Sequence, residues 1–91
     1  MNEVQWKLNE VKSEEEFHDL VQCSLSFPHY YGRNRNAFWD CLNEIVEKMT
    51  VRVSGREGLT NDLRSKIDDY LNMCKEYEEK TEGRFRFTAI P

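Results

Sequence analysis

The sequence predicts an α/β fold in which three short parallel strands pack against helices, in the order β-α-α-β-α-β. Residues 4–8, 50–54 and 85–89 alternate apolar and polar side chains with a period of two, as half-buried strands do. Helical patterns lie between these segments, and helical connections favour parallel strands joined by right-handed crossovers. Because 91 residues support one hydrophobic core, we expect a single domain over residues 1–91.

The first strand is indicated by Val4, Trp6 and Leu8 at alternate positions. A helix over residues 13–25 should follow, because Ser13 and Glu16 have the spacing of a capping box ahead of an apolar stripe. That stripe consists of Phe17, Leu20, Val21 and Leu25.

Pro28 and Gly32 predict a loop over residues 27–35. Asn34 or Asn36 can cap the second helix. Its apolar face would comprise Phe38, Cys41, Leu42, Ile45, Val46 and, at its end, Met49. The opposite face would expose Asn36, Asp40, Asn43, Glu44 and Glu47 to solvent.

The second strand should end at Gly55 and Gly58, and Thr60 or Asn61 can cap a long third helix. The apolar face of this helix would comprise Leu63, Ile67, Tyr70, Leu71, Cys74 and Tyr77. Gly83 stands where a glycine commonly follows a helix, just before the last strand.

The charge balance argues against a general nucleic-acid or membrane-surface binder. Thirteen basic and seventeen acidic residues give a net charge of −4, whereas such binders usually carry a basic field. No apolar run is long enough to cross a membrane, and the first residues do not have the pattern of a signal peptide. Three cysteines without C-x-x-C spacing are typical of reduced thiols, so we expect a cytoplasmic protein.

Catalytic motifs are absent from the sequence. No nucleotide-binding glycine motif, P-loop, zinc-protease motif or nucleophile elbow occurs, so we expect no enzymatic activity, no metal and no cofactor. His18 is expected at the surface and His29 in the exposed loop. Cys41 and Cys74 fall on core faces, where a thiol is a small inert hydrophobe, and the place of Cys23 is open.

The informative segment is residues 27–42, which brings aromatic side chains, a glycine and two asparagines into the approach to the second helix. Aromatic residues on a loop are either buried or used for binding. Tyr, Trp and Arg are also the residue types that anchor protein interfaces.

This segment resembles the barstar family of intracellular ribonuclease inhibitors. The family pattern Pro-x-Tyr-Tyr-Gly-x-Asn-x-x-Ala-apolar-Trp-Asp-Cys-Leu is matched from Pro28 to Leu42, and a weaker similarity extends over the whole chain. The resemblance implies a three-stranded parallel sheet with helices, in agreement with the order predicted above. It also implies a bacterial immunity protein, a monomer when free, that plugs the active site of a ribonuclease in a 1:1 complex.

In that family a carboxylate stands in for the phosphate of RNA among the cations of the nuclease. The resemblance places this role on Asp40. It extends the partner-binding surface over the loop and second helix, with a further acidic contact on the third helix. The expected contacts are Tyr30, Gly32, Arg33, Asn34, Asn36, Trp39, Asp40 and Glu44, with Glu76 or Glu78 as the acidic contact on the third helix.

This chain also departs from the family pattern. Arg33 and Asn36 occupy positions that are usually acidic, so residues 28–42 carry a net charge of +1, from Arg33 and Arg35 against Asp40. Arg84 replaces the second cysteine of some members, so no disulfide with Cys41 follows. These changes suggest a differently charged nuclease or a loss of inhibition.

Other interpretations remain open. Tyr31 is expected to pack under the loop, Trp39 could either bind a partner or cover the core beside Val46, and Gly32 could serve only to supply a positive φ. Interleaved tyrosines and arginines are also typical of single-strand RNA binders, although the net charge makes RNA binding less favoured. An interaction module for an unrelated partner is the third alternative.

Overall fold

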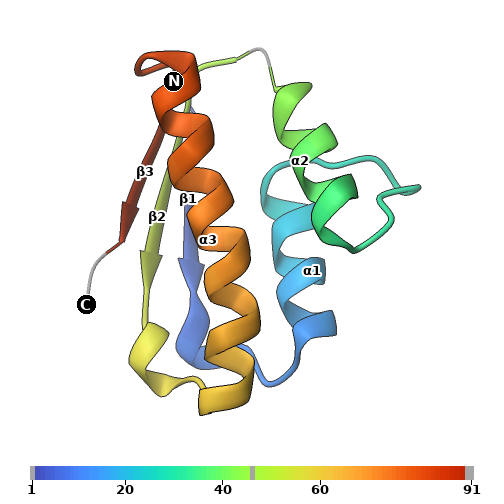
Figure 1. Cartoon of the computed structure of the whole chain (residues 1–91), viewed down its shortest axis with the longest axis vertical. Helices are drawn as coiled ribbons and strands as arrows, with labels where there is room; N and C mark the ends of the chain where they lie inside the picture. The colour runs from blue at the N-terminus through green and yellow to red at the C-terminus, as the bar shows by residue number, and fades with distance from the viewer. Residues whose placement is uncertain (1, 46, 90–91) are drawn as a thin grey trace.

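The computed structural model describes residues 2–45 and 47–89 and contains one parallel three-stranded sheet in the order β1-β2-β3. β1 spans Asn2–Lys7, β2 spans Met49–Ser54 and β3 spans Phe85–Ala89. In this register Val4 pairs with Val51, which pairs with Phe87. The predicted α/β fold and its element order are confirmed (Figure 1).

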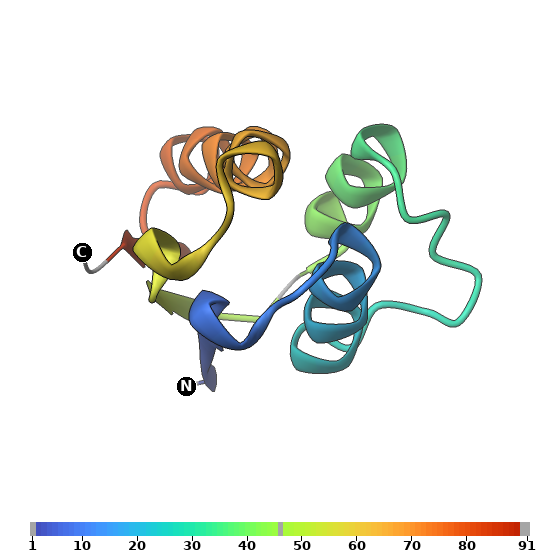
Figure 2. The ribbon, with the colours of Figure 1, turned by 90° about the horizontal axis from the view of Figure 1, so that it is seen from below.

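The α-helices that the structure describes lie to one side of the sheet (Figure 2). α1 spans Glu14–Ser24, α2 spans Arg35–Asn43 and α3 spans Asn61–Thr81. α3 runs along the sheet (Figure 1). α1 and α2 lie beside α3, on the side of the sheet where β1 is (Figure 1). Two short 3-10 helices, Leu8–Glu10 and Arg56–Gly58, follow β1 and β2. Within the described residues, the other face of the sheet carries no helix (Figure 2).

Aromatic side chains join these layers into one core. Trp6 of β1 packs edge-on against Phe17 of α1, with ring centroids 5.8 Å apart, and its indole N–H donates to Ser24 Oγ at 2.7 Å. Phe38 of α2 packs 5.1 Å from Tyr70 of α3. Each helix therefore contributes an aromatic ring to the same buried cluster.

Helix caps were predicted closely from local chemistry. Ser13 Oγ accepts from the amide of Glu16, Asn34 Oδ1 from that of Ala37, and Thr60 Oγ1 from that of Leu63. The structure thus selects Asn34 over Asn36 and Thr60 over Asn61.

The predicted apolar face of the second helix was too long. α2 ends at Asn43 with Glu44 as its cap. Ile45 follows the helix, and its amide donates to the carbonyl of Leu42 at 3.0 Å. Met49 begins β2 and pairs with Phe85, so strand pairing overrides the helical spacing. Val46, predicted on the same face, lies outside the described residues. Leu8 likewise opens a 3-10 helix rather than ending a strand.

None of the helices described by the structure is long and apolar enough to span a membrane.

Candidate functional site

Two aromatic side chains of the loop between α1 and α2 pack into the core and hold the loop against it. Phe27 and Tyr31 are both buried and pack edge-on with ring centroids 5.1 Å apart, and Phe27 also meets Phe38 of α2. The predicted packing of Tyr31 under the loop is confirmed. Tyr30 points the other way and is 72% exposed, so successive tyrosines have opposite environments.

His18 of α1 anchors Tyr31, and its predicted place at the surface was wrong. Its side chain is only 3% exposed, and Nδ1 lies 2.8 Å from the Tyr31 hydroxyl. Nε2 has no hydrogen-bond partner among the described residues and lies 3.6 Å from a carboxylate oxygen of Glu14. Burial lowers the pKa of His18. The loop and Tyr70 of α3 cover this part of α1, a contact that one helix pattern does not reveal.

Arg33 is turned back toward α1. Its guanidinium lies 2.6 Å from the Asp19 carboxylate, donates to Gln22 Oε1 at 3.0 Å and reaches the carbonyl of Glu15 at 3.4 Å. Gln22 also donates to the carbonyl of Pro28 at 2.8 Å. Asp19 and Gln22, which the sequence analysis did not single out, therefore tie both ends of the loop to one helix.

Backbone strain falls on Arg33 rather than on Gly32. Arg33 has φ of 55°, in the left-handed region that most side chains avoid, whereas Gly32 is not among the residues with positive φ. The interpretation that Gly32 supplies a positive φ was therefore wrong. A Cβ at Gly32 would lie 3.3 Å from Asn34 Nδ2 and 3.4 Å from the Ala37 side chain, so Gly32 allows close packing against the start of α2.

The exposed face of α2 presents Asn36, Asp40 and Glu44 to solvent. Asn36 and Asp40 are four residues apart and so share one side of the helix. Among the described residues, the Asp40 carboxylate has neither a hydrogen bond nor an ion pair. A cationic partner can therefore bind this carboxylate without first breaking an ion pair within the chain.

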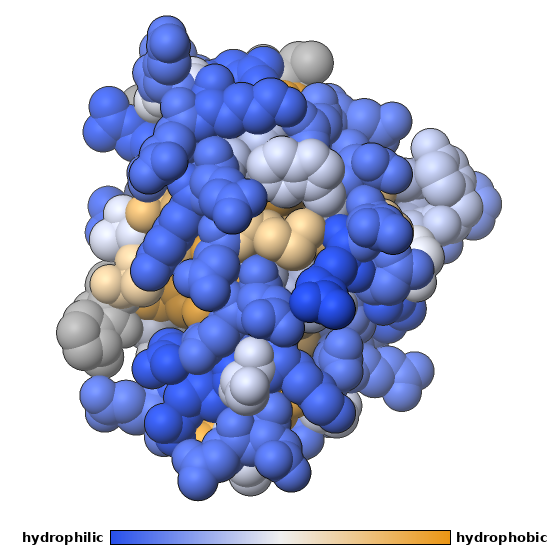
Figure 3. Space-filling view, viewed as in Figure 1, coloured by the Kyte–Doolittle hydropathy of each residue, from blue (hydrophilic) through white to orange (hydrophobic). Residues whose placement is uncertain are grey.

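Trp39 lies half-buried between α2 and α3. Its ring packs edge-on against Tyr77 at 6.0 Å, and Lys80 Nζ lies 5.5 Å from the ring centroid. Lys80 also donates to Asn43 Oδ1 at 2.6 Å. The indole thus covers the core and retains an exposed part, so both interpretations of Trp39 remain compatible with its position. A strip of less polar surface runs between α3 and α2 among hydrophilic side chains (Figure 3).

The two glutamates considered on α3 have different surroundings. Glu78 is half-buried and accepts a hydrogen bond from the amide of Phe87 in β3 at 2.9 Å. Glu76 is exposed. Asp69, seven residues earlier, and Lys80, four residues later, both contact side chains of α2. Residues at these spacings share one helix face, so Glu76 is on the side of α3 that borders α2.

Ion pairs within the chain change the charge of this surface. Residues 28–42 carry +1 by sequence, but Arg33 pairs with Asp19 at 2.6 Å and Arg35 with Asp69 at 3.6 Å. Each arginine therefore has one carboxylate partner from a neighbouring helix. Asp40 is left as the uncompensated charge of the segment, so the surface is locally acidic despite its sequence.

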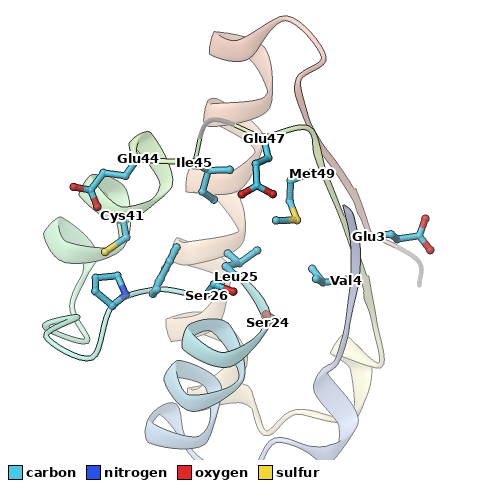
Figure 4. A pocket seen from close by; sticks show the side chains of 12 residues that line it. Glu3, Val4, Ser24, Leu25, Ser26, Cys41, Glu44, Ile45, Glu47 and Met49 are labelled. Carbon is cyan, nitrogen blue, oxygen red and sulfur yellow. The ribbon is translucent and has the colours of Figure 1, made fainter. Parts of the chain in front are cut away.

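A separate hollow of about 630 Å³ lies between β1, the start of the loop and the end of α2 (Figure 4). Leu25, Ile45 and Met49 contribute apolar surface, and Glu3 and Glu44 contribute carboxylates. This hollow shares Glu44 with the exposed face of α2, but neither Tyr30, Trp39 nor Asp40 lines it.

The cysteines form no cluster. Cys41 and Cys74 are free and buried, as predicted, and Cys23 is free and exposed. Burial raises the pKa of the Cys74 thiol, which therefore stays protonated and unreactive. Within residues 2–45 and 47–89, no group of three His, Cys, Asp or Glu side chains could hold a metal ion.

Two comparisons with known proteins identify similar sequences. A family model described as "Barstar (barnase inhibitor)" matches residues 1–90. A relative from Bacillus subtilis (strain 168), named "Putative ribonuclease inhibitor YrdF", is 37% identical over 73 residues. That match covers 79% of this chain and 80% of the relative.

Proposed function

Because the chain belongs to the barstar family, we propose that it inhibits a ribonuclease by covering the active site of the enzyme with the α1–α2 loop and the exposed face of α2. The family consists of inhibitors rather than catalysts, which confirms the prediction that the chain is not an enzyme. The name of the Bacillus subtilis relative supports a ribonuclease as the target. We further propose a cytoplasmic immunity protein of bacterial origin that binds its target 1:1 and is a monomer when free.

The observation that carries this proposal is the isolated carboxylate of Asp40. It is exposed near the middle of α2 and has no internal partner among the described residues. A ribonuclease binds RNA through cations that face the scissile phosphate, and an uncompensated carboxylate can replace that phosphate. We assign the exposed residues Tyr30, Asn36, Glu44 and Glu76 as further contacts, and Trp39 as the ring between α2 and α3.

A rigid loop supports the same mechanism. Three side chains of α1, His18, Asp19 and Gln22, hold the loop through Tyr31, Arg33 and the carbonyl of Pro28. A loop that is ordered before association avoids the entropic cost of ordering during binding. Gly32, Arg33 and Asn34 therefore act mainly by shaping the loop, and we assign the direct contacts to Tyr30, to α2 and to Glu76 of α3.

The proposal is tested by titrating the chain against barnase and against secreted ribonucleases from the organism that encodes it. Parent and Asp40→Ala proteins are compared for inhibition of RNA hydrolysis. We expect the parent to reach full inhibition of one nuclease at equimolar concentration and Asp40→Ala to require a large excess. Equal inhibition by both proteins would refute the phosphate-mimic role, and no inhibition of any of these nucleases would refute the proposed function.

A further inference from the structure

The proposed function does not use a cluster of cations on the sheet, where exposed positions of β2 and β3 alternate with the buried positions that face the helices. The strand register pairs Thr50 with Arg86 and Arg52 with Thr88, so the two arginines are diagonal neighbours on β2 and β3. With Lys48 and Arg84, which precede these strands, they line a hollow of about 420 Å³. We call this hollow the sheet hollow.

Charge is strongly segregated between the sheet hollow and the rest of the molecule. The hollow is lined by four of the thirteen basic side chains and by one of the seventeen acidic ones, Glu3. Its net charge is therefore +3, and the remainder of the chain carries −7. Glu3 pairs with Arg52 at 3.2 Å, and one Arg84 N–H donates to the Tyr77 hydroxyl at 3.1 Å. Arg86 and Lys48 are exposed and have no hydrogen-bond or ion-pair partner among the described residues.

The chemistry of the lining favours a polyanion over a protein. Stable protein interfaces have aromatic or aliphatic anchors at their centre. The side chain that could serve here, Met49, is only 8% exposed, and the remaining lining consists of charged residues, hydroxyls and a glycine. Arginine, lysine and threonine hydroxyl groups are the donors that hold phosphate groups of nucleic-acid backbones.

We propose that the sheet hollow binds the phosphodiester backbone of a single-stranded nucleic acid without reading its bases. None of the described residues that line the hollow has an aromatic ring, so binding rests on charge and hydrogen bonds rather than on base stacking. The negative charge of the remaining surface would keep the strand on this face. The α1–α2 loop lies on the opposite side of the molecule, so this site is independent of the proposed ribonuclease interface (Figure 2).

The test measures fluorescence anisotropy of a labelled oligouridylate with the purified chain over a range of salt concentrations. If four phosphates are neutralised, the slope of log Kobs against log salt should be about −2.8. The variant Arg52→Thr/Arg86→Thr keeps β-forming side chains and should reduce the magnitude of that slope to about 1.4. The control Lys12→Gln/Lys66→Gln removes two exposed cations elsewhere and should bind within about twofold of the parent.

Thermal unfolding of all three proteins keeps the comparison valid, because a variant that unfolds at the same temperature as the parent has lost charge rather than structure. No binding by the parent at low salt would overturn the proposal, as would an equal loss of binding in the control. Binding to vesicles that contain phosphatidylglycerol, without binding to oligouridylate, would assign the hollow to a membrane surface instead and also overturn it.

Discussion

The Nδ1 atom of His18 and the hydroxyl of Tyr31 lie 2.8 Å apart in the interior, and this hydrogen bond joins α1 to the loop that precedes α2. Both side chains are at most 5% exposed. Burial raises the pKa of the Tyr31 hydroxyl and lowers the pKa of His18, so both groups are neutral near pH 7. The shape of the candidate surface therefore depends on a histidine outside it.

Stability should fall on mild acidification because of His18. The unfolded chain binds a proton at this residue near its ordinary pKa of 6.5, and the folded chain binds it only at lower pH. Protonation therefore favours the unfolded chain, so the stability present above pH 6.5 is lost as the pH falls below it, by at most about 1.4 kcal/mol per pH unit.

Urea unfolding of the parent and of His18→Gln from pH 7.5 to 5 measures this effect. The glutamine does not titrate, so the free energy of unfolding of the variant should vary less over this range. Glu14, Asp19, Arg33 and Tyr70 also act on His18 electrostatically or as ring neighbours and are present in both proteins. Parallel pH curves for the two proteins would contradict the prediction.

Asp40→Ala should weaken binding of the target ribonuclease by about 2 kcal/mol or more, or at least thirtyfold, because cations of the enzyme would be left unpaired. Stability should change little, since the carboxylate has no partner among the described residues. Isothermal titration calorimetry measures the affinity. Asp62→Ala, at an exposed position near the start of α3, serves as the matched control and should bind like the parent.

Glu76→Gln and Glu78→Gln should have opposite consequences. Loss of the exposed Glu76 charge should weaken nuclease binding and leave the melting temperature unchanged. Loss of the Glu78 charge weakens its hydrogen bond from the amide of Phe87 and should destabilise the fold by about 1 kcal/mol. Paired melting and binding curves measure both effects, and a binding defect confined to Glu78→Gln would reverse the assignment.

Asp19→Asn should reduce nuclease affinity although Asp19, on α1, is not itself one of the proposed contacts. The change releases Arg33, whose free charge would repel the cations of a ribonuclease site, and it loosens the loop. The stability cost should be within about 1 kcal/mol, because the pair is partly exposed to solvent.

A double-mutant cycle separates the two causes of this effect. If released charge dominates, Arg33→Gln should restore the affinity of Asp19→Asn, and the loss should fade as salt is added. If loop order dominates, Arg33→Gln alone should match Asp19→Asn. Glu10→Gln removes an exposed carboxylate that lies outside α1 and should have no effect. A loss there equal to that of Asp19→Asn would contradict the special role of Asp19.

The fold was predictable because its signals are local. Period-two alternation located the strands, and Ser13, Asn34 and Thr60 are caps whose chemistry acts within four residues. The end of α2 was not predictable in the same way. Met49 has the spacing of a helical face, but its place is decided by pairing with Phe85, a residue far along the chain.

The candidate site was likewise predictable where its signals are local and not where they depend on other helices. The motif of residues 28–42 led to the prediction of Tyr30 and Asp40 as contacts. The carboxylates that pair with Arg33 and Arg35, however, lie on α1 and α3. The charge of the surface therefore could not be obtained by counting along the segment. Spacings of three and four residues place Glu15, Asp19 and Gln22 on one face of α1. This polar face is the signal from which the attachment of the loop to α1 could have been predicted.

The contact of Lys80 with Asn43 and Trp39 has a consequence for the order in which the protein folds. α2 has nine residues, no acidic residue in its first turn and no basic residue in its last, so an isolated copy would scarcely form a helix. The cation near its C-terminal end comes from α3. The helix that carries Asp40 should thus form only after α3 has docked, and its amides should exchange with solvent in the same cooperative opening as those around Lys80.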